Sequence, residues 1–318
     1  NLHLSIRHCQ INVEWIWLLT SSLLHQVMES FYMKDREEKF TFFKSIGNSS
    51  LVKYFTMLFF LVVNFFTPTH ADELKEIGFK ESSKFGVFYS LQTILDTLDE
   101  ARYQSKPKVH QLVAVFEHHC KPRDSRPLSP RRPYPFIVIE GAQRTGRRIL
   151  GKSLAKSIGA KAVVGIPRCL IKLRHQFDTE SELKRTFFGL SNYITAFNIR
   201  HMLENMPVVL IGYWMDQATF NIAKEYPNVL PPASSFIYKF PADLLAPDII
   251  FYLNTPREEL QGNLLDLDFN RKIMEIYRRM REPNVTEVQG KYVTEEFIND
   301  LRTIMREKLQ DRYPHLVF

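Results

Sequence analysis

The chain has 318 residues, of which 45% are hydrophobic and 24% charged. This is enough for one well-buried core with an additional region, too few residues for three domains, and incompatible with disorder throughout. The net charge of +7 suits an anionic ligand or an acidic lipid surface, or simply an ordinary basic surface, but no Lys/Arg run is interleaved with aromatic residues, so no nucleic-acid partner is expected.

Residues 1–80 are expected to form an N-terminal extension that contains an apolar segment at 54–66. Its core, MLFFLVVNFF, is shorter than the roughly 20 residues that a membrane-spanning helix needs. It has the length of a signal-peptide apolar region, and small residues follow it up to Ala71. Three interpretations remain open: membrane or secretory targeting through residues 57–71, a buried helix or strand, or a mis-called exon.

The next part of the chain is predicted to be helical. Apolar residues recur at helix spacing from Phe88 to Leu98, and a second apolar run follows before residue 119. Residues 120–134 are rich in Pro and Arg, and proline disrupts both helices and strand ladders. We therefore expect a helical region at 81–119, a linker at 120–134 and a separate domain at 135–318.

The three cysteines are far apart in the sequence and form no CxxC pair. This spacing favours free thiols in a reducing compartment and gives no reason to expect a metal site. The cysteines are Cys9, Cys120 and Cys169.

Strands and helices alternate after the linker. Short apolar runs bounded by Gly and Pro are typical of buried parallel strands, and amphipathic stretches between them are typical of helices. This order predicts an α/β fold in which a parallel sheet has helices on both faces. The expected strands are 135–140, 161–166, 207–214, 247–254 and 284–289, and the expected helices are 147–158, 180–205, 216–225, 256–264, 267–281 and 293–310.

A glycine loop joins the first of these strands to the first helix. A curled glycine-rich backbone at a helix N-terminus presents N–H groups to phosphate, so this loop is a candidate nucleotide-binding site. The predicted nucleotide-binding residues are Gly141, Ala142, Gln143, Arg144, Thr145, Gly146, Arg147 and Arg148.

Several stretches resemble the thymidylate kinase-like family, in particular its mitochondrial UMP-CMP kinase branch. They occur in the family's order over about residues 134–318: PFIVIEGAQRTG, IPRCLIKLRHQFD, FFGLSNYITA, LPPASSFIYKFPADLLAPDIIFYL and TPREEL. The resemblance implies a P-loop NTPase-type αβα domain with a five-stranded parallel sheet. It also implies ATP, Mg²⁺ and a nucleoside monophosphate as ligands, a mitochondrial location and a homodimer.

The family's catalytic positions differ in this chain, so no catalytic residue is intact. Arg147 stands where the loop lysine is expected, and Arg148, which has only donors, stands where a hydroxyl would bind Mg²⁺. Ile211 and Gly212 replace an Asp-Arg pair after the third strand; Asp216 is a displaced candidate for the missing carboxylate. The arginine-rich lid is replaced by a shortened, acidic segment before Arg271, a poor substitute for the lid arginines.

A binding frame remains around these positions. The predicted acceptor-binding residues are Glu140, Arg174, Tyr193, Tyr213 and Trp214. These residues can also have a purely structural role, because an arginine can simply be solvent-exposed and aromatic rings are often core residues. The sequence therefore favours a pseudoenzyme with weak nucleotide binding. The alternatives are an active kinase that uses ATP and Mg²⁺ on dTMP, UMP or CMP, and a membrane-tethered scaffold that contacts the membrane through residues 54–66 and has no nucleotide ligand.

Overall fold

The computed structural model describes residues 81–121, 132–141, 146–254, 264–280, 282–283, 285–289 and 293–318. The chain divides into two compact units, Asn1–Asp72 and Glu73–Phe318, and every described residue belongs to the second. The N-terminal extension and its apolar segment at 54–66 lie outside the described residues. Within the described ranges, no helix has both the length and the apolar character to cross a bilayer.

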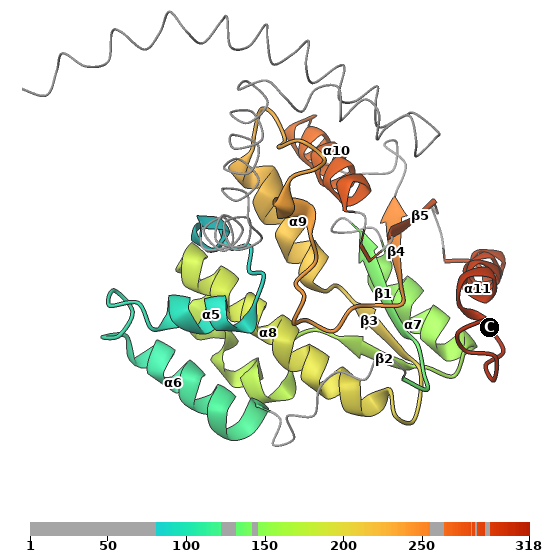
Figure 1. The fold of residues 1–318 in the computed structure, drawn as a ribbon, viewed down its shortest axis with the longest axis horizontal. Helices are drawn as coiled ribbons and strands as arrows, with labels where there is room; N and C mark the ends of the chain where they lie inside the picture. Colours follow the sequence, from blue (N-terminus) through green and yellow to red (C-terminus); the bar gives the residue numbers. More distant parts are fainter. Residues whose placement is uncertain are drawn as a thin grey trace, which may run out of the picture. The chain divides into compact units, whose positions relative to one another are not determined.

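A five-stranded, all-parallel sheet forms the centre of the second unit (Figure 1). The strand order is β2-β3-β1-β4-β5, and this confirms the predicted P-loop-type α/β architecture. The strands that lie inside the sheet are continuous apolar runs because helices cover both of their faces. The strand bounds are β1 (Phe136–Gly141), β2 (Lys161–Val164), β3 (Val208–Ile211), β4 (Ile249–Asn254) and β5 (Val285–Gln289).

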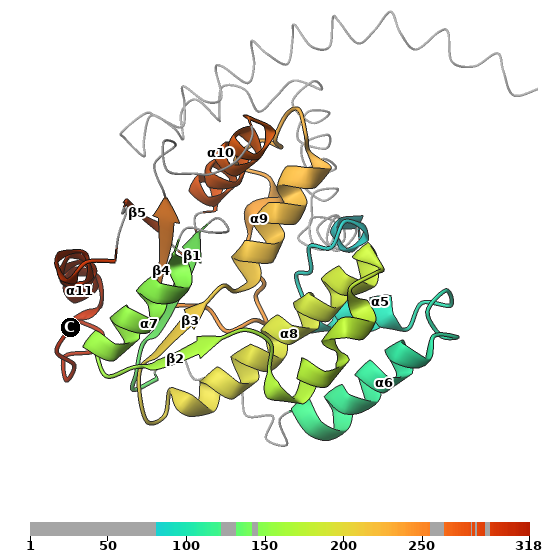
Figure 2. The same ribbon diagram turned by 180° about the vertical axis from the view of Figure 1, so that it is seen from behind.

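Helices cover both faces of this sheet (Figures 1 and 2). Alternate residues of β1 point to opposite sides: Ile137 and Ile139 pack in a cluster with α7 and α11, and Phe136 and Val138 pack in a cluster with α8, α9 and α10. This alternation follows from the two-residue period of a strand. The helices are α7 (Arg147–Ser157), α8 (Ser181–Met202), α9 (Trp214–Glu225), α10 (Leu264–Arg279) and α11 (Glu295–Leu309).

The helical region before the linker packs into the same hydrophobic cluster as α8 and α9. Its elements are α5 (Leu91–Leu98), α6 (Pro107–Val115) and a π-helical turn, η1 (Phe116–Cys120). The Trp214 indole N–H donates to the carbonyl of Phe88 at 2.7 Å, and Asn221 donates to the carbonyl of Gly86 at 2.8 Å. The division into a helical region at 81–119, a linker at 120–134 and an α/β domain at 135–318 stays a proposal. These contacts show that the helical region and the α/β domain share one hydrophobic core.

The expectation of three free thiols is wrong, because Cys120 and Cys169 form a disulfide. The two cysteines are 49 residues apart in the sequence. The fold brings them together because η1 packs against a 3₁₀ segment, η2 (Arg168–Phe177), that follows β2. Sequence spacing alone carries no information about such a long-range pairing. The inference of a reducing compartment consequently has no support from these two residues.

The end of the third strand and the segment after the second strand differ from the prediction. The third strand ends at Ile211 instead of continuing to Trp214, because Gly212 has a positive φ of 78° and turns the chain toward α9. Residues 168–177 form η2, for which the sequence pattern gave no prediction.

Candidate functional site

The candidate site is built where β1 meets α7. The strand ends at Gly141, and α7 begins at Arg147 after Gly146, which has a left-handed φ of 79°. Residues 142–145 of the predicted loop lie outside the described part of the chain. The end of β1 and the start of α7 are thus in the order that a phosphate-binding loop requires, and the first N–H groups of a helix have no partner within the helix.

Arg147 forms a bidentate ion pair with Asp216 in the first turn of α9. Its Nη1 and Nη2 atoms lie 2.6 Å and 3.1 Å from the two carboxylate oxygens, and Nη1 also donates to the carbonyl of Gly141 at 2.9 Å. Burial lowers the pKa of the guanidinium, but the hydrogen bonds and charge of Asp216 raise it above its ordinary value. The side chain at the motif-lysine position is therefore held by protein atoms.

Glu140 completes this arrangement beneath the arginine. Its side chain is fully buried, Oε1 accepts a hydrogen bond from the backbone N–H of Tyr213 at 3.0 Å, and Oε2 lies 3.9 Å from Arg147 Nη1. Burial raises the pKa of Glu140 to about 8, and the neighbouring Asp216 carboxylate adds to the effect, while Arg147 opposes it. We call Glu140, Arg147 and Asp216 the Arg147 cluster.

The residues at the end of β3, Ile211 and Gly212, lie close to the side chains of the Arg147 cluster and of α7. A Cβ on Gly212 would lie 3.5 Å from Asp216 Oδ2 and 4.0 Å from the Arg147 guanidinium carbon. Ile211 is buried and packs against α7 so closely that a Cβ on Gly151 would lie 2.4 Å from its side chain. The two positions that replace the family's Asp-Arg pair therefore make steric contacts and supply neither a carboxylate nor a guanidinium.

Two other predicted cations are solvent-exposed, and Arg144 lies outside the described residues. Arg148 lies on the surface of α7 and Arg174 on the surface of η2, and no carboxylate in the described ranges pairs with either. At the lid end, Arg271 lies 3.3 Å from Asp268, both exposed. Residues 255–263 and the side chain of Asp266 lie outside the described residues.

The predicted aromatic residues are all buried. The Tyr193 hydroxyl donates to Asp243 at 2.7 Å, the Tyr213 hydroxyl donates to the carbonyl of Leu245 at 3.1 Å, and Trp214 is bonded to Phe88 as described above. Burial, then the charge of Asp243, raises the pKa of Tyr193. All three rings belong to the core that α8 and α9 share with the segment before α5.

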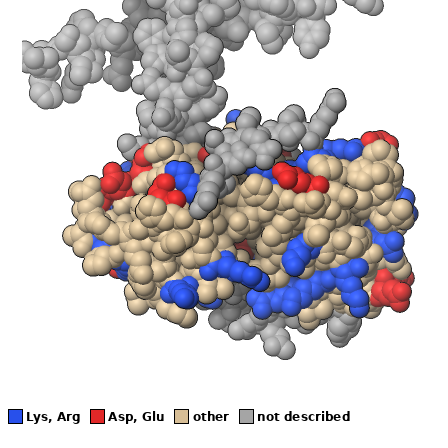
Figure 3. All heavy atoms as spheres, turned by 90° about the horizontal axis from the view of Figure 1, so that it is seen from below, with Lys and Arg blue, Asp and Glu red and all other residues tan. Residues whose placement is uncertain are grey.

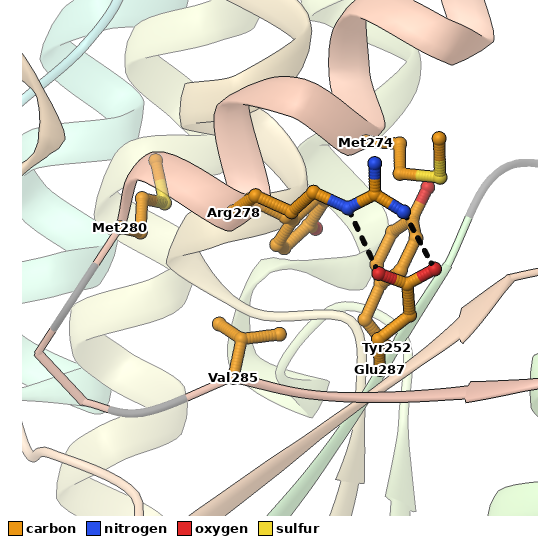
Figure 4. A pocket seen from close by; sticks show the side chains of 7 residues that line it. Tyr252, Met274, Arg278, Met280, Val285 and Glu287 are labelled. Carbon is orange, nitrogen blue, oxygen red and sulfur yellow. Dashed lines mark hydrogen bonds and ion pairs between the residues drawn. The ribbon is translucent and has the colours of Figure 1, made fainter. Parts of the chain in front are cut away.

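A cavity of about 410 Å³ opens between α10 and strands β4 and β5 (Figure 4). The rings of Tyr252 and Tyr277 lie 4.3 Å apart, and Arg278 makes two hydrogen bonds of 3.0 Å to Glu287 across the cavity. Burial, then the charges of Glu140 and Asp216, raises the pKa of Tyr277. Tyr277, which lines the cavity, is therefore close enough to the Arg147 cluster to be affected by its charges. No sequence pattern indicated that the residues of this cavity belong to a site.

The residues around the cluster do not fit a magnesium ion. Mg²⁺ prefers carboxylate, hydroxyl and water oxygens, whereas Arg148 offers only donors and Ile211 is apolar. The Asp216 carboxylate is already engaged with Arg147. In the part of the chain that the structure describes, no group of three or more His, Cys, Asp or Glu side chains is arranged to hold a metal.

Comparison with known proteins identifies curated proteins that are similar in sequence and solved structures that superpose on part of the chain. No protein-family model matches. Human mitochondrial UMP-CMP kinase 2 is 29% identical over 197 residues, a match that covers 56% of this chain and 44% of the human protein. The chain therefore spans less than half of the length of this curated relative.

Two solved structures superpose on part of the chain at low sequence identity. The thymidylate kinase of Candida albicans superposes with a TM-score of 0.43 and 16% identity, over 58% of this chain and 95% of that enzyme. The deoxyadenosine kinase of M. mycoides with bound dATP superposes with a TM-score of 0.38 and 12% identity, over 54% of this chain and 98% of that enzyme.

Proposed function

We propose that this chain, a distant homologue of mitochondrial UMP-CMP kinase 2 in the thymidylate kinase and deoxynucleoside kinase-like P-loop family, is a pseudoenzyme. It retains the phosphate-facing loop between β1 and α7 and binds nucleotide weakly, but it does not transfer phosphate. The chain covers only 44% of the relative, so its activity, substrate and partners are proposals.

The bidentate pair between Arg147 and Asp216 is the observation that carries this proposal. Phosphoryl transfer depends on cations that are free to stabilise the charge on the transferred group. At 2.6 Å and 3.1 Å from the carboxylate oxygens, the guanidinium is already neutralised by a protein anion. A nucleotide would have to compete with Asp216 for Arg147, which supports weak binding.

The loss of several positions together supports the absence of turnover. Arg148 cannot replace a hydroxyl ligand, and Ile211 and Gly212 supply no charged group at the end of β3. Loss of one charge clamp can lower the rate of phosphoryl transfer by about 10³-fold or more. Coupled losses need not add, but together they leave no complete machinery.

A second candidate function is an active nucleoside monophosphate kinase with unorthodox motifs, and the position of Asp216 favours it. Although this residue is displaced along the sequence, its carboxylate lies 3.5 Å from the position of a Cβ on Gly212. The Asp216 carboxylate therefore lies near the end of β3, where the family's aspartate is missing. In this function Asp216 would be a required residue.

Substitution of Asp216 by Asn distinguishes the two functions. In the pseudoenzyme, Asp216→Asn releases Arg147 toward phosphate, and one freed charge-assisted hydrogen bond should tighten ATP binding roughly tenfold. Calorimetric titration of the full chain with ATP measures the change, and Asp300→Asn on the exposed side of α11 is the control for loss of one negative charge. Turnover in the wild type that Asp216→Asn abolishes would instead establish the active kinase.

Restoration of the loop motif alone is not expected to create activity. The double variant Arg147→Lys, Arg148→Thr should show no phosphotransfer, because Ile211 and Gly212 still replace the charged pair after β3. A coupled ADP-release assay with ATP, Mg²⁺ and UMP, CMP or dTMP measures this, and thermal unfolding checks that the variant is folded. Measurable turnover would mean that the end of β3 matters less than proposed.

The cellular setting is proposed from the relative and from the sequence. The human relative is mitochondrial, so we expect a mitochondrial protein that forms a homodimer as the family resemblance implies. A membrane-tethered scaffold that contacts the membrane through residues 54–66 is the remaining alternative; these residues lie outside the described part of the chain. The absence of a thermal shift with ATP, UMP, CMP and dTMP would favour the scaffold over both nucleotide-binding functions.

A further inference from the structure

A run without acidic residues crosses α7, β2 and η2. Residues 141–177 contain nine Lys or Arg and no Asp or Glu. Arg147 is paired inside the site, but most of the other cations are solvent-exposed. We call the following six exposed residues the basic band: Arg148, Lys152, Lys156, Lys161, Arg168 and Lys172.

The fold gathers these residues at one edge of the sheet. Arg148, Lys152 and Lys156 are four residues apart, so they form one row on the surface of α7. Lys161 begins β2, which is the edge strand beside β3, and η2 follows with Arg168 and Lys172. The basic band therefore passes from α7 across the free edge of β2 to η2.

The surface at this edge is visibly basic. Figure 1 draws β2 lowest among the strands, and Figure 3 views the molecule from below, where Lys and Arg side chains gather with few acidic side chains between them. In the described ranges, no acidic residue forms an ion pair with a member of the basic band. The acids after the band already have cationic partners: Asp178 with Lys184, and Glu180 with Lys106 and Lys108.

Two large apolar side chains are exposed among these cations. Ile149 is 63% exposed on α7 and Ile171 is 55% exposed on η2. Each follows or precedes a band residue directly in the sequence. Exposed aliphatic side chains between basic residues suit the interfacial region of a bilayer. Single-stranded nucleic acid is instead bound through aromatic stacking, and no Phe, Tyr or Trp side chain is exposed along the described part of this run.

We infer that the basic band docks the protein on an anionic membrane surface, with Ile149 and Ile171 entering the interface between the headgroups. The basic band shares Arg148 with the predicted nucleotide-binding loop, so the variants that test the inference leave Arg148 unchanged. Attraction of Lys or Arg to anionic lipid is additive to a first approximation and is screened by salt.

Cosedimentation of the full chain with lipid vesicles tests the inference. Vesicles of phosphatidylcholine are compared with vesicles that contain about 30% phosphatidylserine. The wild type should bind the anionic vesicles more strongly, and the difference should disappear at about 0.5 M NaCl, where the screening length is only a few ångströms. Any binding through residues 54–66 contributes to both vesicle types and is removed by the comparison.

The decisive variant is Lys152→Glu, Lys156→Glu, Lys172→Glu. Since each Lys near the surface contributes about fivefold, this variant should lose about 100-fold or more of its binding to anionic vesicles. The matched control, Lys224→Glu, Lys239→Glu, Lys308→Glu, has the same net charge and changes exposed lysines away from the band. It should retain most of the binding. A second variant, Ile149→Ser with Ile171→Ser, should weaken binding without a change in net charge.

Three results would overturn the inference. The first is equal loss of binding in the band variant and its control, which would indicate a general charge effect. The second is wild-type binding that does not depend on anionic lipid or on salt. The third is tighter binding of the protein, through the basic band, to single-stranded RNA than to anionic vesicles in the same buffer. That result would identify nucleic acid as the partner.

Discussion

Replacement of Glu140 by Gln is expected to stabilise the protein at alkaline pH and to flatten its pH dependence between about pH 5 and pH 8. Glu140 is fully buried beneath Arg147, and burial followed by the charge of Asp216 raises its pKa to about 8. Gln keeps an oxygen that can accept the hydrogen bond from the Tyr213 N–H, but it carries no charge. The substitution therefore removes the cost of a buried carboxylate.

The sign follows from the direction of the pKa shift. Because the folded-state pKa of Glu140 lies above the unfolded value, the folded protein binds the proton more tightly between the two pKa values. The free energy of unfolding then falls as pH rises through this window. A shift from about 4.5 to about 8 corresponds to a loss on the order of 5 kcal/mol.

Urea unfolding at a series of pH values measures this effect as the difference between the wild type and Glu140→Gln. Glu307→Gln on the exposed surface of α11 is the control and should follow the wild-type profile. A Glu140→Gln protein whose stability falls with pH as steeply as that of the wild type would contradict the assignment of a raised pKa to this carboxyl group.

Replacement of Asp248 by Asn is expected to lower the free energy of unfolding by about 3–5 kcal/mol, because it leaves a partly buried arginine without its counter-charge. The Asp248 side chain is fully buried and lies 2.6 Å from Arg132 and 2.9 Å from Arg312. Its Oδ2 atom also accepts a hydrogen bond from the backbone N–H of Phe136 at 2.7 Å. One carboxylate thus holds the starts of β1 and β4 together.

Denaturant unfolding of Asp248→Asn measures the loss. The matched control is Asp268→Asn, which breaks an exposed ion pair to Arg271 and should change stability by less than about 1 kcal/mol. If both variants lost the same small amount, Asp248 would be no more important than a surface ion pair.

Local sequence patterns were sufficient to predict the sheet. The runs that became β1, β3 and β4 are apolar and bounded by Pro or Gly, and burial on both faces explains why they do not alternate. The end of β3 was predicted too late because Tyr213 and Trp214 are also apolar. Only the positive φ of Gly212 shows where the chain turns into α9.

Contacts between distant residues could not be predicted in the same way. Arg147 and Asp216 are 69 residues apart, and either residue alone is compatible with a phosphate-binding role. Their pairing depends on the position of α9 relative to α7, which the fold determines and no local pattern encodes. The disulfide between Cys120 and Cys169 has the same origin, since η1 and η2 meet only in the folded chain.

The central claim is that Asp216 and the altered end of β3 leave Arg147 unable to support phosphoryl transfer. Turnover of the full-length wild type with ATP, Mg²⁺ and UMP, CMP or dTMP, followed by coupled ADP release, tests it most directly. We predict no ADP formation above the uncatalysed background with any of the three acceptors. A rate of about 1 s⁻¹, at the low end of the range for kinases, would contradict the claim.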